Sequence, residues 1–135
     1  MLIINIRKEL FDKQDLKYKE FTLKLIPNYN PDKIIGVRAP EIKKIGRKLE
    51  DNSFGWEYFE EINLHGIYIG SVDVDFSSRC EMIDGYIPYI DNWATCDSFV
   101  GCLSFVNDNK KQFLEYLEKH IQFLFYFLLY YLLFP

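Results

Sequence analysis

The amino-acid sequence predicts an all-α fold. Apolar residues recur at the three- and four-residue steps of a helix along most of the chain, and no segment shows the sustained alternation expected of a strand. Short polar turns separate the periodic segments, and the proline- and asparagine-rich segment 27–33 is the clearest of them. About six short helices joined in this way favour a fold of antiparallel helix pairs.

Two amphipathic helices are expected within residues 1–50. Apolar residues at steps of seven, three and four predict one helix that ends before Pro27. These residues are Phe11, Tyr18, Phe21 and Leu25. The second helix is expected from Pro40, which suits a first helical turn, to about Glu50. It would have an apolar face of Ile42, Ile45 and Leu49 and a basic face of Lys43, Lys44, Arg47 and Lys48.

A third helix is expected after the capping residues Asp51, Asn52 and Ser53. Its apolar positions follow at steps of four, three and four: Tyr58, Ile62, His65 and Ile69. Since His65 lies on this apolar stripe, we expect a semi-buried, hydrogen-bonded histidine rather than a catalytic one.

Three further helices are expected in the remainder of the chain. One covers Ser77–Tyr86 and is interrupted near Pro88. The others run from about Asn92 to Leu103 and from about Asn109 into the tail. Both asparagines are predicted to be N-caps.

Charge is divided unevenly along the chain. The net charge is −4, but residues 1–50 carry twelve Lys/Arg and seven Asp/Glu, whereas residues 51–135 carry four and thirteen. This asymmetry is a hint of an anionic partner, although a solvated lysine face gives the same pattern.

The cysteines and the missing motifs limit the chemistry. Cys80, Cys96 and Cys102 have no CxxC spacing, so neither a zinc site nor a disulfide framework is expected, and a reduced, cytoplasmic compartment fits best. No GxGxxG, Walker A, GxSxG or HExxH motif occurs. We therefore expect neither a metal nor a small-molecule cofactor.

The segment 121–134 is strongly apolar, with Gln122 as its one strongly polar residue. A membrane-spanning helix needs about 20 apolar residues, so a buried helix, or one whose covering partners are missing, is preferred to an anchor. Self-association through this tail is the expected consequence.

Trp93 and Asp97 form the most informative pattern. Four residues apart on a helix, they would lie on one face, and a ring beside a carboxylate attracts positive charge. The alternative is a core tryptophan and an aspartate near the start of a helix, where it interacts with the helix dipole.

Three ordered blocks place this pair in a wider pattern. They are KLIPNYNPDKIIGVRAPEIKKIGRKL at 24–49, WEYFEEINLHGIYIG at 56–70 and YIPYIDNWATCDSF at 86–99. Together they resemble the AlkD-like DNA alkylation repair family, over about residues 8–118. The shared features are a Gly-Val-Arg-x-Pro turn into a basic helix and a later Asn-Trp-x-x-x-Asp block.

The resemblance implies a HEAT-like α-α superhelix, of the armadillo-like helical type, that cradles double-stranded DNA. The implied activity is that of a DNA glycosylase, which hydrolyses the N-glycosidic bond of cationic N3- or N7-alkylated purines without base flipping. Trp93 and Asp97 would be catalytic. A basic patch would contact phosphates without reading sequence. Its candidate residues are Lys24, Arg38, Lys43, Lys44, Arg47 and Lys48.

The chain departs from the family after Asp97. Members contribute an arginine and a second tryptophan from later helices, and neither occurs here, which predicts a domain incomplete at the C-terminus and an atypical tail at 121–135. Loss of terminal solenoid repeats would expose apolar surface. A non-catalytic HEAT-like module that binds DNA or protein, an inactive remnant, and a peripheral or tail-anchored membrane protein are the alternatives.

Overall fold

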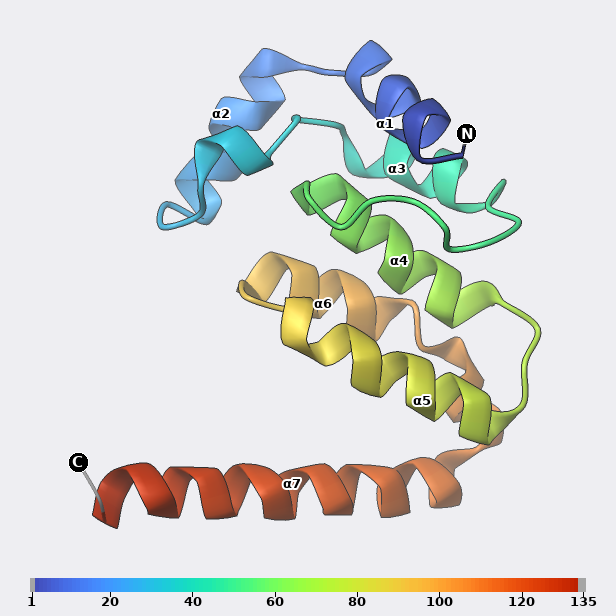
Figure 1. Ribbon diagram of the computed structural model, residues 1–135, viewed down its shortest axis with the longest axis vertical. Coiled ribbons are helices and arrows are strands. Elements are labelled where there is room, and N and C mark those ends of the chain that lie inside the picture. Colours follow the sequence, from blue (N-terminus) through green and yellow to red (C-terminus); the bar gives the residue numbers. More distant parts are fainter. Residues whose placement is uncertain (1, 134–135) are drawn as a thin grey trace. The chain divides into compact units, whose positions relative to one another are not determined.

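The protein is all-helical in the part that the structure describes. This computed structural model describes the backbone of residues 2–133 and the side chains of residues 5–121. Within those limits every regular element is a helix, which confirms the predicted all-α class (Figure 1). Contacts divide the chain into two compact units, residues 1–103 and 104–135, and each is described by itself.

The first unit contains the helices that position the candidate site. Its elements are α1 (Leu2–Asp12), α2 (Leu16–Leu25), η1 (Pro31–Lys33), α3 (Ala39–Gly46), α4 (Phe59–Ser71), α5 (Phe76–Tyr86), η2 (Ile87–Tyr89) and α6 (Trp93–Gly101). In Figure 1, α4 and α6 point the same way and α5 points in the opposite direction. α4 contacts α3, α5 and α6 and is therefore the central helix of this unit.

The prediction of one helix through residues 11–25 is wrong, because the chain breaks between α1 and α2. Asp15 caps α2: its carboxylate accepts from the amide of Tyr18 at 3.0 Å. The backbone amide of Asp15 also donates to the carbonyl of Gly36 at 2.8 Å. The predicted apolar stripe is largely outside the core, since Phe11, Phe21 and Leu25 are exposed.

Gly36 allows the chain to pass close to α2. Its φ of +95° lies in the left-handed region, and an added Cβ would lie 2.6 Å from Cβ of Lys19. The buried carboxylate of Glu60 accepts from the amides of Ile35, Gly36 and Val37 at 3.0, 2.8 and 3.3 Å. Burial raises the pKa of Glu60, while these three bonds lower it. One side chain of α4 thus holds the turn that leads into α3.

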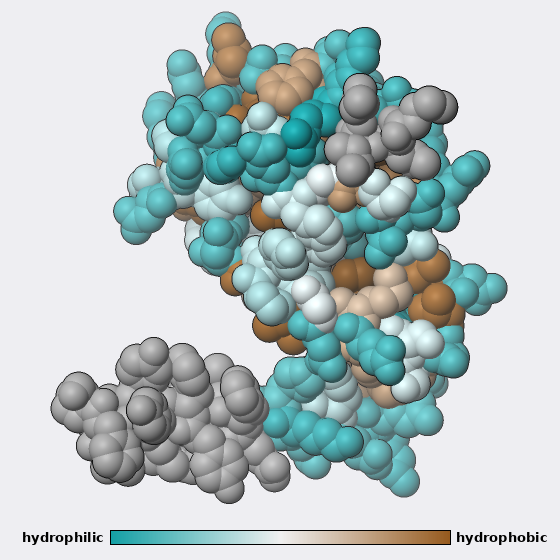
Figure 2. All heavy atoms as spheres, in the orientation of Figure 1, coloured by the Kyte–Doolittle hydropathy of each residue, from teal (hydrophilic) through white to brown (hydrophobic). Residues whose placement is uncertain are grey.

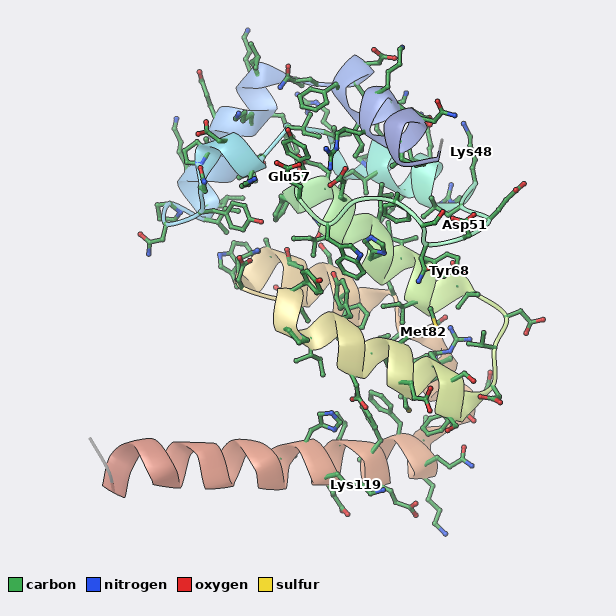
Figure 3. The ribbon with its side chains drawn as sticks, in the orientation of Figure 1. Lys48, Asp51, Glu57, Tyr68, Met82 and Lys119 are labelled. Atoms are coloured by element: carbon green, nitrogen blue, oxygen red, sulfur yellow. The ribbon has the colours of Figure 1, made fainter. Side chains whose placement is uncertain are left out.

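Helix α3 has the predicted two faces, although it ends at Gly46 rather than near Glu50. Ile42 and Ile45 are buried in a core cluster with residues of α1 and α4. The four basic residues opposite are exposed, as predicted. Hydrophilic residues predominate on the visible face of α1 to α3 (Figure 2), and Lys48 points outward beyond the end of α3 (Figure 3).

The connection between α3 and α4 is a long return segment, residues 47–58, and not the short turn expected. The predicted capping residues bond to one another within this segment and do not cap α4. The amide and hydroxyl of Ser53 donate to Oδ1 of Asp51 at 2.9 and 2.6 Å. At the start of α4, the buried carboxylate of Glu61 accepts from the amides of Glu57 and Tyr58 and from Arg7 of α1. The return segment is therefore tied to both α1 and α4.

His65 is hydrogen-bonded as predicted, since its Nε2 lies 3.1 Å from the Gly55 carbonyl, but it is fully buried rather than semi-buried, with 1% of the residue exposed. Its ring stacks on Phe54 at 3.9 Å and on Trp56 at 3.4 Å between centroids. Trp56 in turn stacks on Tyr89 at 4.2 Å. Burial lowers the pKa of His65 to about 4, so the imidazole is neutral at pH 7.

Two glycines let α4 approach its neighbours. A Cβ on Gly70 would lie 2.2 Å from the carbonyl oxygen of Cys102, and one on Gly66 would lie 3.0 Å from the hydroxyl of Tyr86. That hydroxyl donates to the Ile62 carbonyl at 3.0 Å. The backbone of α4 therefore approaches the Tyr86 side chain of α5 and the backbone just after α6 closely.

The second unit consists of η3 (Ser104–Asp108) and α7 (Lys110–Leu133). The backbone carbonyl of Asn109 accepts the first hydrogen bond of α7, from the amide of Phe113. The side-chain Nδ2 of Asn109 donates backward along the chain, to the carbonyl of Phe105. The side chains of most of the apolar tail predicted at 121–135 lie outside the described residues. In the described part of the chain, no helix has both the length and the apolar character needed to cross a bilayer.

Candidate functional site

The start of α6 is built by Asn92, which is the N-cap predicted from sequence. Its Oδ1 accepts from the amide of Thr95 at 2.8 Å, and its Nδ2 donates to Oγ1 of Thr95 at 3.0 Å. Because Thr95 is 1% exposed, this cap is anchored to the interior. Trp93 is the first helical residue, and Asp97 follows it one turn later.

Trp93 lies at the surface and not in the core, since it is 54% exposed. Its Nε1 donates to the carbonyl of Leu25, the last residue of α2, at 3.1 Å. That carbonyl has no partner within its own helix, so the indole satisfies a polar group that a helix end leaves free. The ring is thereby held in one orientation while much of its surface faces solvent.

One side of Trp93 borders a hollow of about 500 Å³, here called the tryptophan hollow. Its lining residues are Leu25, Ile26, Pro27, Asn28, Tyr29, Asn30, Lys33, Trp56, Glu57, Ile62, Asp91, Asn92 and Trp93. Burial and the charge of Asp91 raise the pKa of Tyr29 to about 12, so this phenol is neutral at pH 7.

Asp97 borders a second hollow of about 420 Å³, here called the aspartate hollow. It is lined by residues of α2, of α4 and of α6, together with the chain at 37–43. The carboxylate of Asp97 makes no ion pair or hydrogen bond among the described residues, and it is exposed. Lys43 of α3 lines the same hollow, so opposite charges border a largely apolar surface.

The structure does not bring Trp93 and Asp97 into one pocket. Trp93 lines the tryptophan hollow and Asp97 the aspartate hollow, and the two hollows share the lining residues Leu25 and Ile26. A ligand that engages both side chains must therefore reach from one hollow to the other. An elongated ligand fits this arrangement better than a single enclosed small molecule.

Half of the predicted basic residues are already in ion pairs. Arg38 pairs with Asp15 at 2.9 Å and lies over the ring of Tyr18, with its Cζ 5.2 Å from the ring centroid. Lys44 pairs with Glu41 at 2.9 Å. The closest contact of Lys48 is with Glu9, at 4.0 Å.

The other basic residues are exposed and form no ion pair in the part of the chain that the structure describes: Lys24, Lys43 and Arg47. Lys24 lies in the last turn of α2, whereas the other two lie on and just after α3. Lys43 is the residue of this set that shares a hollow with Asp97.

No family model, curated protein or solved structure matches this chain. No group of His, Cys, Asp or Glu in the described residues has the arrangement of a metal site.

Sequence reasoning missed several residues that line the two hollows. Tyr29, Trp56 and Asp91 reach the tryptophan hollow from three separate segments. Asn63 lines the aspartate hollow, and its Oδ1 is buried without a hydrogen-bond partner. Of these, only Asp91 had a local signal, because it lies two residues before Trp93.

Proposed function

We propose that this protein acts on duplex DNA as an alkylpurine glycosylase of the AlkD-like kind, with Trp93 and Asp97 as its catalytic residues. The observation that supports this most is the exposed carboxylate of Asp97, which has no ion pair or hydrogen bond among the described residues. It lies one helical turn from an exposed indole and lines the same hollow as Lys43. The three sequence blocks that resemble the family lie in the same unit.

The proposed chemistry depends on stabilising positive charge. An alkylated purine is cationic, and its departure leaves an oxocarbenium-like sugar. The Asp97 carboxylate would stabilise that cation and orient an attacking water, and the Trp93 ring would pack against the sugar. Since the two groups line separate hollows, the nucleotide would extend from one hollow to the other rather than enter a closed pocket.

Binding would rest on phosphate contacts. Lys24, Lys43 and Arg47 have no ion-pair partner among the described residues, so they are the strongest candidates. Arg38 and Lys44 would exchange a carboxylate for a phosphate and gain less net energy. Such contacts bind DNA without reading its sequence, and they weaken as salt rises.

The arrangement of α4, α5 and α6 supports the proposed superhelix. Two parallel helices with an antiparallel helix between them along the chain are typical of stacked helical pairs (Figure 1). The return segment 47–58 departs from this regularity, because it replaces a tight turn between α3 and α4.

Release of 7-methylguanine from methylated duplex DNA tests the activity. We expect release by the wild type and a loss of at least about 100-fold in Asp97→Asn, which keeps the shape but removes the charge. Asp73→Asn, at an exposed position between α4 and α5, is the matched control and should release base normally. Equal release by wild type and Asp97→Asn would exclude Asp97 from catalysis.

A DNA-binding module without catalysis is the second candidate, and the separation of Trp93 and Asp97 into two hollows favours it. It predicts salt-sensitive binding of duplex DNA and no base release by the wild type. The same two measurements therefore separate the candidates.

A further inference from the structure

The tryptophan hollow combines aromatic surface with negative charge. The indole of Trp93 is held at its N–H by the Leu25 carbonyl, so its exposed surface borders the hollow in a fixed orientation. Tyr29 contributes a second ring and packs edge-on against Phe59, with centroids 5.7 Å apart. Trp56 stacks on two other rings and therefore offers less free surface.

Asp91 supplies the net charge of this hollow. Lys33 and Glu57 also line it, but they pair with each other at 2.9 Å and so offset one another. Glu57, labelled near the start of α4 in Figure 3, also forms an ion pair with Arg7, whose Nη1 lies 3.1 Å from its Oε2. The carboxylate of Asp91 is exposed, and its hydrogen bond is with the neutral amide of Asn92.

We propose that the tryptophan hollow binds the methylated ammonium group of a small molecule, between Trp93, Tyr29 and Asp91. A ring face and a carboxylate both attract a cation, and a hollow of about 500 Å³ has room for such a group. This binding does not depend on the proposed action on DNA.

A methylated ammonium suits the hollow better than a bare ammonium or a metal ion. Methyl groups spread the charge, reduce hydration and make contact with aromatic surface. A bare ammonium is strongly hydrated and gains mainly from hydrogen-bond acceptors, so it would use the Asp91 carboxylate but gain little from the ring of Trp93. A metal ion needs several oxygen ligands, whereas among the described residues that line this hollow Asp91 is the one carboxylate outside an ion pair.

Calorimetric titration of the full chain with choline chloride tests the proposal. The neutral compound 3,3-dimethylbutan-1-ol has the same shape without the charge. We expect choline to bind at least about fivefold more tightly than this alcohol, since a cation–π contact contributes roughly 1 kcal/mol or more. Equal affinities, or no saturable binding at about 50 mM choline, would overturn the proposal.

Variants locate the binding site. Trp93→Leu should weaken choline binding by about 5- to 30-fold, and Trp93→Phe, which keeps a ring, by less. Asp91→Asn changes an exposed side chain and should fold normally, so it keeps the test valid if Trp93→Leu does not fold. We expect it to weaken binding by about threefold at low salt and by less at high salt. Unchanged affinity in Asp91→Asn would exclude the charge contribution.

Asp97→Asn separates this site from the proposed catalytic site. Its carboxylate lines the other hollow, so choline affinity should stay within about twofold of wild type while base release falls. Choline binding that persists in a protein with no base release would leave the cation site intact and remove the glycosylase proposal. The reverse result would remove only the cation site.

Discussion

The indole N–H of Trp93 donates to the main-chain carbonyl of Leu25 over 3.1 Å, although the two residues are 68 positions apart in sequence. The bond joins the first residue of α6 to the last residue of α2. It holds the aromatic ring at the edge of the tryptophan hollow and fixes its orientation. Trp93, which the sequence suggests as a catalytic residue, thus also connects two helices.

Trp93→Phe should lower the free energy of unfolding by about 0.5–1 kcal/mol, because the Leu25 carbonyl loses its partner while the packed ring is largely retained. Urea denaturation followed by circular dichroism measures this change. Phe21→Leu is the control, since Phe21 is also exposed but its ring forms no hydrogen bond. If Trp93→Phe lowers the free energy of unfolding no more than Phe21→Leu does, the hydrogen bond adds no stability.

Gly70→Ala should destabilise the fold by more than about 2 kcal/mol, because the new methyl group would lie 2.2 Å from the backbone oxygen of Cys102. Gly85→Ala is the matched control on α5. Its added Cβ meets nothing within 4 Å, so the better helix propensity should stabilise by about 0.5–1 kcal/mol. Thermal unfolding of the two variants should shift in opposite directions. A neutral Gly70→Ala would contradict the close approach of α4 and the end of α6.

Acidification should destabilise the protein through His65. Its pKa is about 4 in the folded state, below the ordinary value of 6.5, so the unfolded chain binds the proton first as pH falls. Stability is therefore complete above about pH 6.5 and declines toward pH 4, by about 2 kcal/mol between pH 7 and pH 5.

His65→Phe isolates this effect because it preserves an aromatic ring between Phe54 and Trp56. The variant should lose the hydrogen bond to Gly55 and start from a lower stability, yet show a flatter dependence on pH. Urea titrations at pH 5 and pH 7 give the change in the free energy of unfolding between the two pH values, for the wild type and for the variant. Identical pH dependence in wild type and variant would show that another group is responsible.

The double variant Lys43→Gln, Arg47→Gln should weaken duplex DNA binding and lower the slope of log affinity against log salt by about two, since each phosphate contact contributes about 0.9. Fluorescence anisotropy at several salt concentrations measures both quantities. Lys8→Gln is the control, because Lys8 lies on α1 and is already paired with Asp12 at 2.7 Å. An unchanged slope in the double variant would place the DNA contacts elsewhere.

Local features were predicted well. The basic and apolar faces of α3 and the N-cap Asn92 follow from residues within a few positions of one another, and the structure confirms them. The break between α1 and α2 was missed, because it depends on Asp15 meeting Gly36 across the fold. The later start of α4 was missed for the same kind of reason: Glu61 ties the return segment to α1 through Arg7.

By itself, the sequence determined the helical class, the charge of α3 and the placement of Trp93 and Asp97 one turn apart. These properties depend on the spacing of residues along the chain, which can be read directly from the sequence. Only the tertiary structure decided that the pair borders two hollows, because Leu25 and Ile26 come from the end of α2. It also decided which cations are unpaired, since the carboxylates of Asp15 and Glu41 reach Arg38 and Lys44 through folding.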